Sequence, residues 1–549
     1  MKRGTARMAG LATALILAGA AAPAPAQRAF PDTLGAWTLT HDGGAFDAVP
    51  RAEYLRAHAF SLDHYLEFAP GGVVVRRGPI GSVAAWSRWG IGRGRGALSI
   101  NGVSFNNPES GVAPWVDVAT SGLGRLDFDT GARAPSWIEG SVDLVGAPPS
   151  PSRPSTYIEL SKGANDVRQR RVHFGSEQGR VGIELSYDEV LDDGYAFDAT
   201  GVIGDVPDFG KARSRNSAIV LRGSPDERAD FTFGVRRFES TTSGDIGDRI
   251  AEGRRDGHLA WLDAAAGGAR VTVYGRGFKS AGPDSQAVNE TSGIALDTGV
   301  GGSEREIHVR VAVEETSFSQ DVGAGSAGRL LGGNGVVSTH SRLGSLVEVF
   351  ASGSAAGDDE SDLVWGATAG VRRVAPRYLV SAQAGRSGRL PTLAERYLPA
   401  HDRDGRVVSG DAGVDPEHAF EVRGDWEQRT AALVNRVRVS WVTAGRHIAF
   451  RPRAVGNETW RVAANSGVSP SMLFAEERFH TEFRTGPLRT LADGSVLLSS
   501  GDRVDAFASV PELQANASLL VGGEMFGGTS ALYVGAEYLH MDERADYDG

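Results

Sequence analysis

Apolar and polar residues alternate along most of the chain, from about Thr156 to its end. The alternation is clearest at 181–187, 307–314, 436–441 and 532–538, where apolar residues take every second position. Successive side chains of a β-strand point to opposite faces, so each segment predicts a strand with one apolar and one polar face. Counting these segments gives roughly eighteen or nineteen strands.

Three features favour a membrane barrel over a soluble sandwich or propeller. Arg and Glu lie at strand centres on the polar face, as expected for a wet lumen, and the segments have the length of a tilted strand that crosses hydrocarbon. Connections alternate between short ones such as 266–269 and long polar ones such as 192–213 and 401–411. We therefore predict an all-β membrane protein with a large antiparallel transmembrane β-barrel. A secreted soluble β-rich protein remains the alternative, since alternation alone also fits it.

Residues 1–26 have the three parts of a secretory signal peptide. Lys2, Arg3 and Arg7 form a charged start, residues 11–22 form a short apolar core, and Ala24-Pro25-Ala26 supplies a cleavage site. No later segment has eighteen uninterrupted apolar residues, so membrane-spanning helices are not expected. The chain is predicted to be exported.

Composition excludes several classes of function. Removal of the signal peptide takes away three cations and changes the net charge from −11 to −14, which disfavours nucleic acid as a partner. The chain has no cysteine, its 12 histidines are scattered, and it contains no Gly-x-Ser-x-Gly elbow. We expect no enzyme activity, no cofactor and no metal site. The acidic runs at 358–362 and 402–411 are interpreted as solvated outer loops rather than cation sites.

Residues 60–111 form a compact, glycine-punctuated segment ahead of the strands. A short helix is predicted at 62–68 and strands at 73–75 and 97–100, followed by turns at Asn101-Gly102 and Asn107-Pro108. Further strands at 123–128 and 138–144 would complete a small α+β unit. The run 90–96 resembles a phosphate-binding loop, but no helix follows it, so we interpret it as a flexible loop.

The same segment is rich in arginine. Two interpretations are open for these side chains: they grip an anionic ligand, or they pair with carboxylates that line the barrel lumen. The second is favoured because buried arginines need such partners and bind carboxylates bidentately. The residues concerned are Arg76, Arg77, Arg88, Arg93 and Arg95.

Two sets of motifs resemble those of TonB-dependent outer-membrane receptors, which import siderophores, cobalamin and similar scarce nutrients. The first set lies at 66–75, 87–90, 98–103 and 106–108 and resembles the family's plug, with Arg88, Gly90, Arg93, Asn101, Gly102, Asn107 and Pro108 as motif residues. The second set lies at 389–397 and 414–417 and resembles two barrel motifs, with Arg389, Pro391, Glu395, Tyr397, Pro416 and Glu417. Both sets occur in the order that the family shows.

The resemblance implies a 22-strand type of barrel with an N-terminal plug. We expect a signal peptide at 1–26, a plug domain at 27–150 and a transmembrane barrel at 151–549. It also implies a receptor in the cell outer membrane that binds a small-molecule ligand and imports it with energy from a TonB-type coupling protein. Outer-membrane lipid would be the other partner.

Two departures from the family leave alternatives open. No clear TonB box is visible between Gln27 and Pro50, where Asp32-Thr33-Leu34 and Trp37-Thr38-Leu39 are faint candidates. A non-energised outer-membrane porin or scaffold barrel is therefore the second hypothesis. The strand count is also below 22 and single-chain barrels use even numbers, which predicts a chain short of about three or four C-terminal strands.

Overall fold

The computed structural model describes residues 47–541 with gaps, and the signal peptide and both TonB-box candidates lie outside the described residues. The gaps are at 51–60, 69–72, 77–83, 90–94, 119, 121–122, 130–140, 147–153, 164–165, 195–209, 227–228, 247–248, 267, 283–284, 303–304, 322–324, 345, 404–405, 431, 456–457, 487, 503–506, 508–509 and 526–529.

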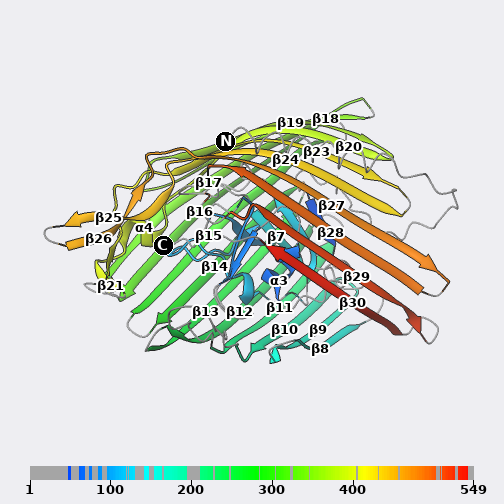
Figure 1. Cartoon of the computed structure of the whole chain (residues 1–549), viewed down its shortest axis with the longest axis horizontal. Helices are drawn as coiled ribbons and strands as arrows, with labels where there is room; N and C mark the ends of the chain where they lie inside the picture. Colours follow the sequence, from blue (N-terminus) through cyan, green and yellow to red (C-terminus); the bar gives the residue numbers. More distant parts are fainter. Residues whose placement is uncertain are drawn as a thin grey trace.

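Nineteen strands form one large antiparallel barrel sheet within the described residues (Figure 1). Each strand pairs with the next along the barrel from β8 to β30, and β30 and β8 are neighbours in the strand order. The number agrees with the count made from the alternation. The strands are β8 (Ser155–Lys162), β9 (Arg168–Gln178), β10 (Val181–Asp192), β11 (Ala212–Asp226), β12 (Ala229–Ile246), β13 (Arg249–Ala266), β14 (Ala269–Gly282), β15 (Ser285–Gly302), β16 (Arg305–Asp321), β17 (Ser326–Leu343), β18 (Val347–Asp358), β19 (Val364–Ala375), β20 (Tyr378–Arg389), β23 (Glu417–Arg429), β24 (Leu433–Gly445), β27 (Ser471–Thr485), β28 (Leu488–Gly501), β29 (Leu513–Met525) and β30 (Ser530–Met541).

The two ends of the barrel differ in the length of their connections. At one end, which we call the short-turn end, the strands are joined at 178–181, 226–229, 266–269, 302–305 and 485–488. At the other, the long-loop end, the connections include 192–212, 389–417, 445–471 and 501–513. The long connections all lie at this end, as predicted for a membrane barrel, although β12 and β13, and β14 and β15, are joined by short turns at the same end.

The apolar face of the barrel points outward. On β10, Leu185 and Tyr187 are 38% and 37% exposed, whereas Glu184 and Ser186 between them are buried. On β8, Leu160 is 76% exposed. A protein in water buries such residues, so this surface fits contact with hydrocarbon. None of the described helices is long and apolar enough to cross a membrane.

Aromatic side chains in the barrel lie over glycines of the adjacent strand. A Cβ added to Gly257 would come within 2.1 Å of the ring of Phe238, which is its directly paired residue on β12. Within the described strands the same arrangement recurs at Gly234/Trp261, Gly293/Tyr274, Gly328/Phe318, Gly370/Phe350 and Gly494/Phe479. At these positions a glycine is therefore needed because a neighbouring ring fills the space of a side chain, and not because the backbone turns.

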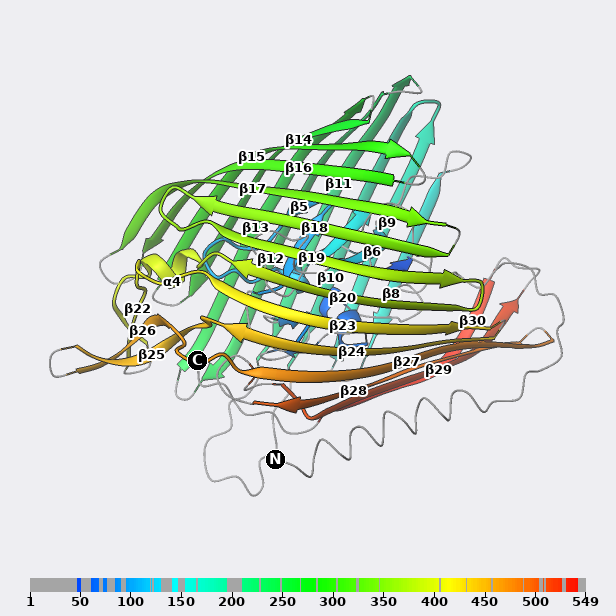
Figure 2. The same ribbon diagram turned by 90° about the horizontal axis from the view of Figure 1, so that it is seen from above.

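The plug fills part of the barrel interior (Figures 1 and 2). Its helix and strands agree with the elements predicted at 62–68, 73–75, 97–100, 123–128 and 138–144. A central sheet has the order β1-β6-β7-β4-β5, and β2 and β3 form a separate hairpin. The elements are β1 (Asp47–Pro50), α3 (Leu62–Phe68), β2 (Val73–Arg76), β3 (Ala84–Ser87), β4 (Ala97–Ile100), β5 (Val103–Ser104), η1 (Trp115–Asp117), β6 (Leu123–Asp129) and β7 (Ser141–Gly146).

The hydrophobic core of the plug continues into the barrel wall. Trp86 packs edge-on against Trp115 at 5.7 Å inside the plug. Phe105 then contacts Phe238 and Phe278 of the barrel at ring distances of 5.8 and 5.3 Å. The plug is thus packed against β12 and β14.

Two long connections fold into a small sheet at the long-loop end. Its order is β21-β22-β26-β25, and it lies next to the short helix α4 (Leu393–Tyr397) at the left of Figure 1. The strands are β21 (His401–Arg403), β22 (Arg406–Ser409), β25 (Ile448–Val455) and β26 (Glu458–Asn465).

Candidate functional site

Arg95, one of the plug arginines expected to pair with lumenal carboxylates, meets the barrel motif residues Arg389 and Glu417 in a buried ionic cluster at the long-loop end. Arg95 of the plug binds both oxygens of Glu417 at the start of β23, with N–O distances of 2.7 and 3.1 Å. Arg389 at the end of β20 binds the same carboxylate at 2.7 Å. Glu417 is 1% exposed and Arg389 2%. One carboxylate therefore joins the plug to two barrel strands.

Glu395 completes this cluster from α4. Its two oxygens accept hydrogen bonds from Arg389, both at 2.9 Å, and one also accepts the backbone N–H of Thr392. The Thr392 hydroxyl accepts the N–H of Glu395 in return, which makes a capping box. The spacing of Arg389, Thr392 and Glu395 thus serves both the ionic cluster and the helix start.

His447 lies beside the cluster without entering it. Its Nδ1 is 3.6 Å from Glu417 Oε1, and the residue sits between β24 and β25. Burial, followed by the positive charge of Arg95, lowers the pKa of His447 to about 3. A neutral imidazole does not compete with Arg95 for the carboxylate.

The predicted Asn-Pro turn of the plug docks on α4. The carbonyl oxygens of Pro108 and Glu109 accept the N–H groups of Leu393 and Ala394 at 3.2 and 2.9 Å. Asn107 accepts a hydrogen bond from Asn289 on β15 at 2.9 Å. We call residues 105–111 the apex loop. It joins the plug to a helix that lies in a long-loop connection.

The other residues of the barrel motifs, Tyr397, Pro391 and Pro416, lie in the same region. Tyr397 stacks on Phe318 of β16 at 5.3 Å, and its hydroxyl donates to Glu360. Pro391 lines a cavity between the apex loop and the wall. Pro416 immediately precedes β23.

The remaining plug motif residues are only partly described. Gly90 and Arg93 lie outside the described residues, as does Arg77. Arg88 faces Glu421 of β23 at 3.8 Å, and the adjacent Trp89 packs in a barrel cluster with Val442 and Phe474. Arg88 and Arg95 therefore both face lumenal carboxylates, as the pairing interpretation expects.

The Asn101-Gly102 turn touches the barrel wall. Asn101 and Gly102 have φ angles of 50° and 78°, the left-handed conformation of a tight hairpin. Gly102 receives support from Asp143, which accepts its N–H at 2.9 Å, and from Arg310 of β16, which donates to its carbonyl oxygen. The turn is thus fixed from the plug side and from the barrel side.

We expect Gly102→Ala to destabilise plug docking by about 1–2 kcal/mol from backbone strain alone. An added Cβ would also lie 2.5 Å from Arg310 Nη1 and would displace that side chain. Gly179→Ala is the matched control, since Gly179 has a φ of +64° and nothing within 4 Å of an added Cβ. Denaturant unfolding of the two variants measures the difference, and equal losses would contradict a role for the Arg310 contact.

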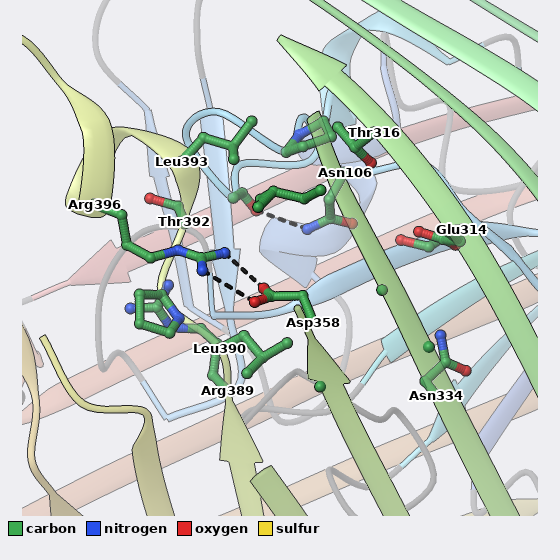
Figure 3. Close-up of a pocket in the computed structure, with 18 of the residues that line it drawn as sticks. Asn106, Glu314, Thr316, Asn334, Asp358, Arg389, Leu390, Thr392, Leu393 and Arg396 are labelled. Atoms are coloured by element: carbon green, nitrogen blue, oxygen red, sulfur yellow. Dashed lines mark hydrogen bonds and ion pairs between the residues drawn. The ribbon is translucent and has the colours of Figure 1, made fainter. Parts of the chain in front are cut away.

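A cavity of about 170 Å³ lies between the apex loop, α4 and the barrel wall (Figure 3). Its lining carries two ion pairs, Arg396 with Asp358 at 2.7 Å and Arg276 with Glu314 at 3.1 Å. Asp358 belongs to the acidic run 358–362, which was expected to be a solvated outer loop. That interpretation is wrong for Asp358, whose carboxylate is 8% exposed and bound by Arg396.

A second cavity, of about 180 Å³, is lined by Glu109 of the apex loop and by residues of β12, β13, β14 and β15. Ser280 donates to the Glu109 carboxylate at 3.3 Å. Burial raises the pKa of this carboxyl above its ordinary value of 4.5, and the hydrogen bonds with Ser280 and Asn107 oppose that rise. Docking of the apex loop therefore has a cost when Glu109 is ionised.

Glu109→Gln is expected to stabilise the protein at neutral pH and to change little in acid. Because docking raises the pKa of Glu109, its stabilising contribution is full below about pH 4.5 and is lost as the pH rises through the folded-state pKa. Thermal unfolding should show a gain of roughly 1–2 °C at pH 7 and none at pH 4. The exposed Glu458→Gln is the control. An equal gain at both pH values would contradict the assignment.

Some plug contacts were not foreseen from the sequence. Asp117 of η1 binds Ser214 at 3.0 Å and Arg255 at 3.3 Å, and Thr120 donates its N–H to Asp188 at 2.7 Å. These partners are far apart in the chain, and no local pattern connects them. Among the described residues, no group of three or more His, Asp or Glu is placed to hold a metal ion.

No protein-family model matches the chain, and no curated protein matches it in sequence. Solved structures do match. The siderophore receptor PirA from Pseudomonas aeruginosa has a TM-score of 0.67 and 11% identity, over 90% of this chain and 91% of its own.

Two further structures have comparable similarity. The copper transporter OprC has a TM-score of 0.69 and 14% identity, over 84% of this chain and 80% of its own. The FrpB iron transporter from Neisseria meningitidis has a TM-score of 0.68 and 10% identity, over 90% and 87%. The matching structures are TonB-dependent outer-membrane receptors, and none is an enzyme. With its plug inside a barrel of this size, the chain has the fold of the TonB-dependent outer-membrane receptors.

Proposed function

We propose that this protein is an outer-membrane receptor that binds a scarce small-molecule nutrient and imports it by displacement of the plug. The observation that carries the proposal is the plug–barrel contact: Arg95, Glu417 and Arg389 hold a folded plug across the lumen. In this proposal the contact opens when the plug is displaced, and the solute then passes through the lumen. Binding and a conformational change, rather than bond chemistry, would be its activity.

The proposed ligand class is taken from the fold neighbours. The neighbours are described as receptors or transporters for siderophores, copper, iron and haem. We extend that range to this chain, with a siderophore, cobalamin or a similar compound as the ligand. The proposed organisation is a signal peptide at 1–26, a plug at 27–150 and a barrel at 151–549. A TonB-type protein would supply the energy from the periplasm.

Uptake in a strain that lacks its own receptors tests the proposal. Cells that express the chain are given ferric siderophores, cobalamin, haem or Cu²⁺, with and without an uncoupler. We expect accumulation of one of these compounds, and its loss when the proton-motive force is removed. Uptake that persists with the uncoupler supports the non-energised porin or scaffold instead. That alternative is based on the lack of a clear TonB box between Gln27 and Pro50. Absence of uptake for every compound overturns the nutrient-import proposal.

A plug tethered to the barrel should bind its ligand and fail to import it. The chain has no cysteine, so an Asn107→Cys/Asn289→Cys pair can be joined selectively by a short bifunctional thiol reagent. The two asparagine side chains are hydrogen-bonded at 2.9 Å across the plug–barrel boundary. We expect at least a tenfold loss of uptake after treatment. Each single-cysteine variant is a control, and unchanged uptake in the tethered pair would contradict plug displacement.

A further inference from the structure

A cluster of cations lies on the outward face of the barrel at the long-loop end of β8–β11. These four strands lie side by side at one edge of the barrel (Figure 1). Along each strand the cations take the same alternate positions as the exposed apolar residues Leu160, Val172 and Ile219, so they lie on the same outward face. We call this set the basic patch: Lys162, Arg168, Arg170, Lys211, Arg213 and Arg215.

The strand register places the patch in two adjacent rows. Arg170 and Arg215 are both paired with Glu189 of β10, one from each side. In the next row toward the loops, Lys162 is paired with Arg168. Leu191 of β10 lies between the two arginines of this row, paired with Arg168 on one side and with Arg213 on the other. With strands roughly 4.8 Å apart, the patch is about 15 Å wide. That width is comparable to one lipid head group.

The arginines are organised around one buried carboxylate. Glu189 is 3% exposed, and it lies 2.6 Å from Arg213, 3.0 Å from Arg215 and 3.6 Å from Arg170. The side chains of these arginines nevertheless remain 41–61% exposed. Glu189 holds the three guanidinium groups together while they keep their solvent-facing edges.

Counted over the described residues, the patch has a surplus of positive charge. Its six cations are accompanied by Glu189, Asp166 and Asp193. On the neighbouring strands at the same level, Arg254 binds two carboxylates, Glu239 and Asp256, at 3.2 and 3.0 Å, and Glu239 is directly paired with Arg215 at the border of the patch. The surplus is local in a chain whose net charge is −11. A compound that this patch attracts is an anion.

The surface next to the patch shows what kind of anion fits. Toward the short-turn end the same strands present Ile158, Leu160, Val172 and Ile219, which are 65%, 76%, 41% and 49% exposed. A dissolved anion would gain nothing from this apolar face. An amphiphile would place its charged head on the cations and its acyl chains on the apolar side chains.

We propose that the basic patch binds the phosphorylated head group of a lipid in the leaflet at the long-loop end. The inference rests on the membrane location in the proposed function. Arginine pairs bidentately with phosphate, and basic clusters at the edge of a membrane-spanning surface attract anionic head groups. Two phosphates of one head group would reach both rows of the patch. The site is separate from the plug and from the lumen.

Lipid binding by the purified full-length protein in detergent tests this site. The probes are lipid A and the same lipid after removal of its phosphates, with inorganic phosphate alone as a third sample, and bound lipid is counted by native mass spectrometry. We expect lipid A to be retained at least tenfold better than its phosphate-free form. Competition by inorganic phosphate at equal concentration would show that the patch takes a free anion and would overturn the lipid assignment.

Two matched variants locate the binding. Arg168→Gln/Arg170→Gln/Arg213→Gln should lower lipid A retention about tenfold. Arg254→Gln/Lys279→Gln/Arg329→Gln, which changes three outward cations at the same end of β13, β14 and β17, should leave it unchanged. Equal retention in the two variants, or equal retention of both lipids by the unaltered protein, overturns the proposal.

A milder variant covers the case in which the triple variant does not fold. Lys162→Gln/Lys211→Gln changes side chains that are 68% and 76% exposed, and it should lower retention about threefold. No change in this variant would also overturn the proposal. The assay needs no transport, so failure of nutrient uptake leaves the lipid result standing. Nutrient uptake together with equal binding of the phosphorylated and phosphate-free lipids would refute the lipid site and leave the proposed import function standing.

Discussion

Glu417→Gln is expected to loosen the plug and to destabilise the folded protein by about 3–5 kcal/mol. The substitution leaves Arg95 and Arg389 in a buried site without the carboxylate that both of them bind. Arg389 keeps Glu395, and Arg95 keeps the carbonyl oxygen of Ile448 at 2.8 Å. Glu395 is charged but balances only one of the two arginines, and the carbonyl oxygen of Ile448 carries no net charge. Denaturant unfolding and leakage of large antibiotics into cells measure the two effects.

Glu458→Gln is the matched control for this prediction. Glu458 lies on β26 in the same long-loop region, where it is exposed and accepts a hydrogen bond from Trp460. It should cost less than about 1 kcal/mol. Arg95→Gln combined with Glu417→Gln should cost less than the sum of the two single changes, because the residues are in contact. Additive losses, or a Glu417→Gln protein as stable as the control, would contradict the ionic cluster as the main link.

Deletion of residues 28–150 is expected to convert the protein into an open pore. The deleted segment contains every described element of the plug, and the remaining strands are those of the barrel. Barrels of about 16–18 strands already enclose an aqueous channel, so a nineteen-stranded barrel without its plug should conduct. Planar-bilayer recordings should show ion current that rises by roughly tenfold or more over the intact chain.

The full-length protein and the Gly179→Ala variant are the controls for the deletion. Both retain the plug and should stay closed under the same voltage. A deletion protein that inserts into the bilayer and conducts no better than the intact chain would refute the assignment of this segment as a plug. Heat-modifiable migration in gels provides an independent check that the protein without residues 28–150 still forms a barrel.

Local patterns account for what the sequence predicted well. A period of two is visible within one strand, so the barrel strands and their number were found without knowledge of their partners. The helix at 62–68 and the hairpin at Asn101-Gly102 also depend on neighbours in sequence. The motif residues of plug and barrel were named one by one. Their positions along the chain did not reveal that the two sets meet.

Contacts between distant residues account for what was missed. Arg95 was expected to bind a lumenal carboxylate, but its partner Glu417, 322 positions away, was not identified, and neither was the pair of Arg396 and Asp358, which are 38 positions apart. Such pairs are set by the barrel register, which is a property of all the strands together. The four-stranded sheet at the long-loop end was missed because its strands are short and lie inside connections. Several glycines face aromatic rings inside strands, a role that also depends on a residue of the neighbouring strand.

The rings that lie over cross-strand glycines have a consequence for how this sequence can change over time. A shift of two residues between β12 and β13 would bring Phe238 and Trp261 opposite residues that have side chains, so each ring–glycine pair rejects misaligned strands. The glycine of a pair cannot gain a side chain while the ring stays in place. Relatives should replace ring and glycine together, and this coordinated variation should identify neighbouring strands from sequences alone.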